Sequence, residues 1–202
     1  MLLFAAGFAL SLFGSLPPGL ISLTVSQTSI ARGFLSAMVL AAGAASAEFF
    51  QAWVAVLLTD WFLSHPGAER MFQWAAMPVF FILGIHLLFF AKPPRPFAPV
   101  IQSSLFRQFF KGVFVSIFNL LAIPYWFVYC NWLQVEGWWQ TGLFSTLIFA
   151  LGVSVGTLFA LGWYAWLGQI ILRRSSQVAR YANTLIGLIF LGIGLKVLWG
   201  LI

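Results

Sequence analysis

Long apolar runs separated by short polar breaks dominate the chain. Several runs exceed the roughly 20 residues that an α-helix needs to cross the hydrocarbon core of a bilayer. The breaks carry glycine, proline and charge, as at Arg32-Gly33 and from Lys92 to Pro96. The pattern therefore predicts an all-α membrane protein with six spans, at residues 2–24, 34–63, 71–91, 109–133, 141–171 and 181–201.

Composition supports a multi-pass membrane protein. Of 202 residues, 62% are hydrophobic and only 7% are charged, whereas a soluble domain carries about 25% charged residues. Eight of the ten Lys and Arg residues lie in or beside the first, third and fifth breaks. Under the positive-inside rule this places those breaks in the cytoplasm and both termini outside a bacterial inner membrane. The net charge of +6 thus indicates orientation among membrane lipids, and no nucleic-acid partner is expected.

The two halves of the chain resemble each other. Three spans per half would make equivalent spans enter from opposite sides, which is the inverted-repeat plan of many secondary transporters. We expect a first repeat over 1–91, a basic cytoplasmic linker over 92–108 and a second repeat over 109–202. The alternative is an ordinary bundle whose halves share composition alone. The aligned segments are 7–13 with 112–118, 43–50 with 152–159, and 80–88 with 190–198, at offsets of 105, 109 and 110.

Helix-breaking residues lie inside the first and fourth predicted spans. Pro17-Pro18-Gly19 interrupts the first, and Asn119 with Pro124 interrupts the fourth. Matched breaks of this kind point to a substrate site near the midplane of the membrane.

The polar residues that follow the first break extend this prediction. A helix restarting after Gly19 would present free N–H groups to an anionic group, and Ser22 lies in the polar stretch that follows. Two purely structural interpretations of these residues stay open. In one the hydroxyls simply bond their own backbone, and in the other Asn119 holds open backbone rather than substrate.

Glu48 is the single carboxylate in the middle of a predicted span. A charge at that depth costs about 2.5–3.5 kcal/mol on insertion scales, so such residues usually serve a substrate or proton path. Gln51 shares its helix face at i+3. We expect Glu48 to carry the coupling proton and Gln51 to belong to the same site. The alternative is a structural hydrogen bond to Asn119, Gln51 or a tryptophan N–H.

These residues resemble a known family, the LysE-type (LysE/RhtB) amino-acid exporters. The resemblance rests on Pro17-Pro18-Gly19, Arg32-Gly33, Ala47-Glu48 and the stretch from Gly112 to Asn119. The chain departs from the family pattern where Leu120 replaces a proline after Asn119 and where Glu48 stands for the usual Asp. The resemblance implies proton-coupled export of an amino acid or similar small metabolite, by an antiporter and not an enzyme.

Other function classes find less support in the residues. Two distant histidines and one cysteine, Cys130, offer no catalytic or metal cluster and no cofactor motif. Haem ligation by His86, metal or cation export, a membrane enzyme and a purely accessory subunit stay open as alternatives. Gly152-x-x-x-Gly156 predicts a packing face for another helix, and such glycine-lined faces are also compatible with a homodimer.

Overall fold

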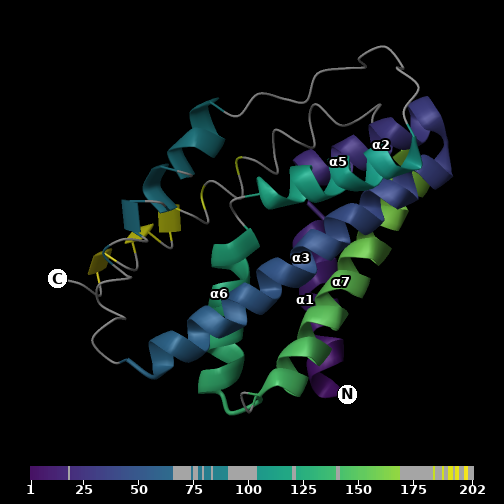
Figure 1. The fold of residues 1–202 in the computed structure, drawn as a ribbon. Coiled ribbons are helices and arrows are strands. Elements are labelled where there is room, and N and C mark those ends of the chain that lie inside the picture. Colours follow the sequence, from purple (N-terminus) through teal and green to yellow (C-terminus); the bar gives the residue numbers. More distant parts are fainter. Residues whose placement is uncertain are drawn as a thin grey trace.

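The computed structural model describes residues 1–17, 19–65, 104–119, 122–139 and 142–168, with scattered positions between 74 and 90 and between 184 and 199. All regular elements within these residues are helical (Figure 1). The third and sixth predicted spans, Pro18 and most of the predicted linker lie largely or wholly outside the described residues. The named elements are α1 (Leu2–Ser15), α2 (Leu20–Arg32), α3 (Phe34–Leu63), η1 (His86–Phe90), α5 (Leu105–Ile117), α6 (Ala122–Val135) and α7 (Leu143–Trp166).

Two of these helices are long and apolar enough to cross a membrane by themselves. They are α3, over Phe34–Phe62, and α7, over Leu143–Trp166. The helix α3 coincides with the predicted span 34–63. Its 30 residues extend about 45 Å, which is longer than the hydrocarbon core is thick, so a spanning α3 either tilts or extends into the headgroup region. The predicted class of multi-pass helical membrane protein is confirmed.

A third apolar segment is interrupted where the sequence predicts a break. The helices α1 and α2 meet at an angle of 76° across residues 16–19. The predicted end of this span at residue 24 is wrong, because α2 continues to Arg32 and ends at Gly33, whose φ of 87° favours glycine. Two hydroxyls of this polar stretch bond the backbone of their own helix, since Thr24 donates to the carbonyl of Leu20 and Thr28 to that of Thr24.

The second predicted break also exists, but it lies before Pro124. The helix α5 ends at Ile117 and α6 begins at Ala122, and Figure 1 shows the chain changing direction between them. Pro124 lies in the first turn of α6, where a missing backbone N–H removes no helical hydrogen bond. The turn itself is closed by Asn119, whose N–H donates to Ser116 and whose carbonyl accepts from Ala122.

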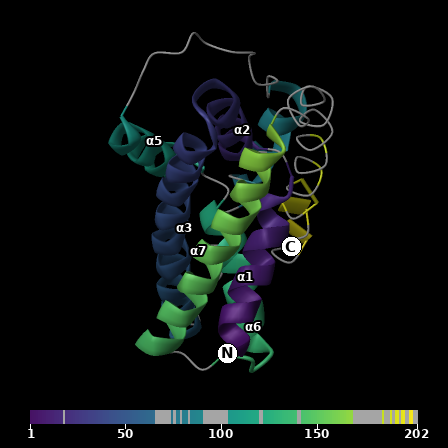
Figure 2. The ribbon, with the colours of Figure 1, turned by 90° about the vertical axis from the view of Figure 1, so that its right-hand side faces the viewer.

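Glycines bring two pairs of helices into backbone contact. A Cβ on Gly43 of α3 would collide with the carbonyl oxygen of Phe109 in α5, and a Cβ on Gly112 of α5 with that of Leu40 in α3. The helices α1 and α7 lie side by side in the same way (Figure 2). There Gly152 and Gly156 approach the carbonyls of Phe4 and Phe8. The predicted packing face of Gly152-x-x-x-Gly156 is confirmed.

The buried apolar residues form two separate clusters. The α6 cluster joins α6 to the C-terminal half of α3 and the N-terminal half of α7. The α2 cluster joins α2 to the N-terminal half of α3 and the C-terminal half of α7. The α6 cluster comprises Ala52, Ala55, Val56, Ala122, Trp126, Cys130, Leu133, Trp139, Phe149, Ala150 and Val153. The α2 cluster comprises Ile21, Val25, Ala37, Leu40, Ala41, Ala44, Leu161, Tyr164 and Ala165.

Candidate functional site

Glu48 lies where α3 crosses α7, and its side chain is 7% exposed. The hydroxyl of Thr157, on α7, donates a hydrogen bond to its carboxylate. Thr157 is also 2.6 Å from the hydroxyl of Ser11, on α1. When Glu48 is ionised, Thr157 directs its one hydroxyl proton to the carboxylate, and Ser11 is then the donor in the second bond. A hydrogen-bonded row from α1 through α7 thus ends on the carboxylate.

The partner of Glu48 is therefore a hydroxyl. The alternatives drawn from the sequence, namely a structural bond to Asn119, to Gln51 or to a tryptophan N–H, are not the bond found here. Within the described part of the chain, Glu48 does not belong to any group of three or more His, Cys, Asp and Glu residues placed to hold a metal ion.

Gln51 lies one turn further along α3 and binds the end of α5. Its Nε2 donates to the carbonyl oxygen of Ser116 at 3.0 Å. The same carbonyl accepts from the backbone N–H of Asn119 at 2.9 Å. The side-chain oxygen of Gln51 and the hydroxyl of Ser116 are buried and have no hydrogen-bond partner among the described residues. The structure thus joins Gln51 to the second helix break, one turn along α3 from Glu48.

The residues of the first break bond mainly to their own backbone. Gly19 donates its N–H to the hydroxyl of Ser22 at 2.8 Å, and that hydroxyl lies 3.1 Å from the carbonyl of Gly19. Pro17 lies in the bend between α1 and α2. The hydroxyls of Ser22, Thr24 and Thr28 therefore bond to nearby backbone, as the structural interpretation of the sequence expects.

Two serines of α2 instead reach the last turn of α7. Ser26 donates to the carbonyl of Tyr164 at 3.0 Å, and Ser29 to that of Ala165 at 2.6 Å. The last four carbonyls of a helix have no partner within it, so these serines satisfy them and hold α2 against α7. The hydroxyl of Tyr164 in turn donates to the carbonyl of Leu16, at the break between α1 and α2.

Sequence reasoning missed three residues of this site: Ser11, Ser116 and Thr157. A signal for them was available, because Ser11 and Ser116 are the equivalent serines of the two Gly-x-x-x-Ser motifs. Thr157 lies in the segment 152–159 at the position aligned with Glu48. Trp139 was also misplaced. A tryptophan near the end of a predicted span is expected in an interfacial aromatic belt, but Trp139 is 4% exposed and its ring centroid lies 4.7 Å from that of Phe149 in the α6 cluster.

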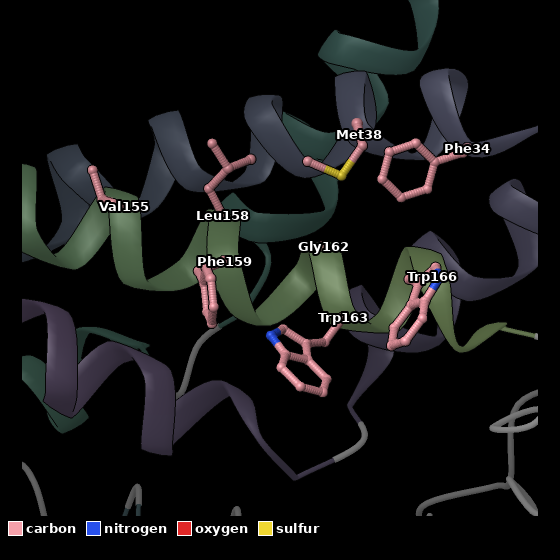
Figure 3. A pocket seen from close by; sticks show the side chains of 8 residues that line it. All are labelled: Phe34, Met38, Val155, Leu158, Phe159, Gly162, Trp163 and Trp166. Atoms are coloured by element: carbon pink, nitrogen blue, oxygen red, sulfur yellow. The ribbon is translucent and has the colours of Figure 1, made fainter.

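A groove of about 430 Å³ runs between α3 and α7, beside the site (Figure 3). It opens where Gly162 leaves space opposite Met38, and aromatic rings of α7 border it. None of its lining residues is ionisable, and Glu48 is not among them. The lining therefore offers no charged or ionisable partner to a ligand. The groove is lined by Phe34, Met38, Val155, Leu158, Phe159, Gly162, Trp163 and Trp166.

Apolar spanning helices around a buried, hydrogen-bonded carboxylate define a multi-pass membrane protein with a polar centre, a plan typical of transporters. The chain belongs to the LysE type translocator family, whose sequence model matches residues 12–200. No curated protein and no solved structure matches it. The predicted family is confirmed, and with it a translocator of small molecules.

Proposed function

We propose that the protein is a secondary-active exporter of amino acids or related small metabolites in the bacterial inner membrane, and that Glu48 carries a coupling proton. One observation carries the proposal. Glu48 is buried at a helix crossing between two closed apolar clusters, and a hydroxyl is its hydrogen-bond partner. A carboxylate at that depth lowers the stability of the folded protein. Its presence is therefore best explained by a role in translocation.

Contacts at the crossing support two inverted repeats. Glu48 bonds Thr157, and Ser154 donates to the carbonyl of Ala45 at 3.0 Å. Both pairs are 109 positions apart, which is the offset that aligns 43–50 with 152–159. Equivalent positions touch only on a symmetry axis. Since Met38 lies against Gly162, α3 and α7 run antiparallel, and a two-fold axis through their crossing would invert one half relative to the other.

The glycine contacts obey the same relation. Gly7 approaches the backbone of Phe149 and Val153, whereas Gly112 approaches that of Leu40 and Ala44. Gly7 and Gly112 are 105 positions apart in the chain. Their contacts on α7 and α3 differ by 109 in each case. This agreement supports repeats over 1–91 and 109–202 better than shared composition does.

The same offsets relate the two apolar clusters. Ile21 and Val25 of the α2 cluster align with Trp126 and Cys130 of the α6 cluster, and Leu40 aligns with Phe149. The two clusters are therefore equivalent, and they lie on opposite sides of Glu48 along α3. We call each cluster a plug, because it closes Glu48 off from one side of the membrane. We propose that they separate in turn, as alternating access requires. The α2 cluster would open to the cytoplasm, since α2 ends at Arg32 on the side predicted to be cytoplasmic.

In this scheme Glu48 takes up a proton when the α6 cluster opens outside and releases it when the α2 cluster opens inside. Substrate binds at the carboxylate of Glu48 after the proton has left it, and is released when the protein opens outward again. The remaining candidate residues, Pro17, Pro18, Gly19, Ser22, Asn119 and Pro124, would then shape the breaks about which α2 and α6 move. An accessory subunit would need neither the buried carboxylate nor two equivalent plugs.

The test is export from proteoliposomes that hold the full-length protein and are loaded with an amino-acid mixture, with a pH gradient imposed across the membrane. Glu48→Gln should abolish gradient-driven efflux while the protein stays folded. Glu136→Gln is the matched control, because Glu136 is exposed in the turn after α6. Gradient-driven efflux from Glu48→Gln at the rate of the control would remove the proposed role of Glu48.

A further inference from the structure

Resting on the proposed export function, we infer that Gln51 and Ser116 join Glu48 in a subsite for the ammonium group of the transported molecule. Nothing in the family match assigns these two residues a role. The subsite lies between α3 and the C-terminal end of α5, next to the second helix break.

Two buried polar atoms without partners mark the subsite. The side-chain oxygen of Gln51 and the hydroxyl of Ser116 make no hydrogen bond within the described residues. Gln51 is 8% exposed and Ser116 is fully buried. Buried polar atoms in native proteins are nearly always paired, so two neighbouring exceptions beside a buried carboxylate point to a ligand.

Each free group at this place can accept a hydrogen bond. The Nε2 of Gln51 is held by the carbonyl of Ser116 at 3.0 Å, so the free atom of the amide must be its oxygen. The carbonyl of Ser116 is already used by Gln51 and Asn119, which leaves the serine hydroxyl for a ligand. Glu48 precedes Gln51 by three positions and therefore lies on a neighbouring part of the same helix face.

The end of α5 adds negative potential at the same place. The helix ends at Ile117, one residue after Ser116, and the C-terminal end of a helix carries partial negative charge. Carboxylate, amide oxygen, hydroxyl and helix end all favour a cation.

The number of acceptors favours an ammonium group over a metal ion. A primary ammonium group has three N–H donors, one each for Glu48, Gln51 and Ser116. Hard metal cations such as Mg²⁺ and Ca²⁺ require six or more oxygen ligands. The structure thus fits a primary amine better than it fits an ion of that kind.

The equivalent position under the proposed repeat relation has no such subsite among the described residues. At the offsets of 105 and 109, Ser116 corresponds to Ser11, whose hydroxyl is already bonded to Thr157. Gln51 corresponds to Ala160, and Glu48 to Thr157. Open acceptors are therefore found at only one of the two equivalent positions, which predicts one ammonium subsite for each chain.

The experiment uses the full-length protein in proteoliposomes loaded with amino acids, with their N-acetylated forms, or with the matching carboxylic acids that lack the amino group. Efflux of each compound is measured by mass spectrometry. Wild-type protein should export amino acids and discriminate at least about tenfold against both analogue sets. Gln51→Met and Ser116→Ala should each raise the half-saturating concentration about ten- to a hundredfold.

Ser46→Ala is the matched control, because the Ser46 hydroxyl bonds within α3 to the carbonyl of Ala42. Equal export of the analogues by wild-type protein would overturn the subsite while leaving export itself intact. So would variants at Gln51 and Ser116 that behave as Ser46→Ala does. The analogue comparison needs no variant, so it stands if a variant fails to fold. A wild-type protein that exports none of the compounds would overturn both the subsite and the proposed function.

Discussion

The hydroxyl of Thr157 donates a hydrogen bond to the carboxylate of Glu48 across the crossing of α3 and α7. The two residues occupy equivalent positions of the proposed repeats, 109 residues apart. A site of this kind lies on the proposed symmetry axis, where a single acid can serve both halves of a transporter. Variants that disturb this bond, or the helix contacts around it, should therefore affect stability and transport together.

Replacing Thr157 should separate the role of its hydroxyl from that of its shape. Thr157→Val keeps the volume but leaves Glu48 and Ser11 without their shared partner. A hydrogen bond to a charged group contributes about 1.5–3 kcal/mol, which corresponds to about 3–12 °C in the unfolding temperature of a chain of this size. We expect the thermal midpoint in detergent and the efflux rate both to fall, and Thr157→Ser to retain most of each. Equal behaviour of the two variants would show that the hydroxyl is not needed.

The glycine contacts should tolerate no added methyl group. Gly43→Ala and Gly112→Ala place a Cβ against the backbone of the partner helix, and overpacking of this kind costs about 1–3 kcal/mol. We expect less monodisperse protein after heating, as measured by size-exclusion chromatography. Gly142→Ala is the control, because nothing lies within 4 Å of the place that its Cβ would occupy and its φ is 174°. Wild-type heat resistance in both helix-contact variants would contradict the close approach of α3 and α5.

Part of this architecture could be predicted from the sequence, because strong local patterns determine it. The bounds of α3 follow from an apolar run that begins after Arg32-Gly33 and ends before His65. The break at Pro17 to Gly19 follows from proline chemistry. The burial of Glu48 could be predicted because an acid in the middle of such a run has no route to water except through the protein.

Other features depend on contacts between distant residues and left no local pattern. The polar run near Ser26 falls beyond the predicted end of the first span, yet it is helical, and Ser26 and Ser29 bond the carbonyls at the end of α7. Trp139 suggested an interface residue, yet it packs against Phe149. Hydroxyls are common in membrane helices, so Thr157 does not stand out by itself. It could be found only by assuming that the aligned positions 48 and 157 of the two repeats touch each other.

The serines that hold α2 on α7 should control how easily the α2 cluster opens. The double variant Ser26→Ala, Ser29→Ala removes two bonds worth about 0.5–1.5 kcal/mol each, so the open population should rise by up to about a hundredfold. The measurement is the labelling rate of Val25→Cys, in a Cys130→Ala background, by a membrane-impermeant maleimide.

The control for that experiment is Thr24→Ala, Thr28→Ala, whose hydroxyls bond within α2. It removes the same number of hydroxyls from the same helix without detaching it from α7. Equal labelling rates in the two double variants would show that the bonds from α2 to α7 do not hold the plug closed.

Sidedness of labelling at Cys130 and at Val25 tests the central claim most directly, because these residues are equivalent in the two plugs and both are fully buried. Right-side-out and inverted vesicles are treated with the impermeant maleimide, using wild-type protein for Cys130 and the Val25→Cys, Cys130→Ala protein for the other plug. We predict that Cys130 reacts from the outside alone and that the cysteine introduced at Val25 reacts from the cytoplasmic side alone. Reaction of both from the same side would contradict two inverted halves closing on one buried carboxylate.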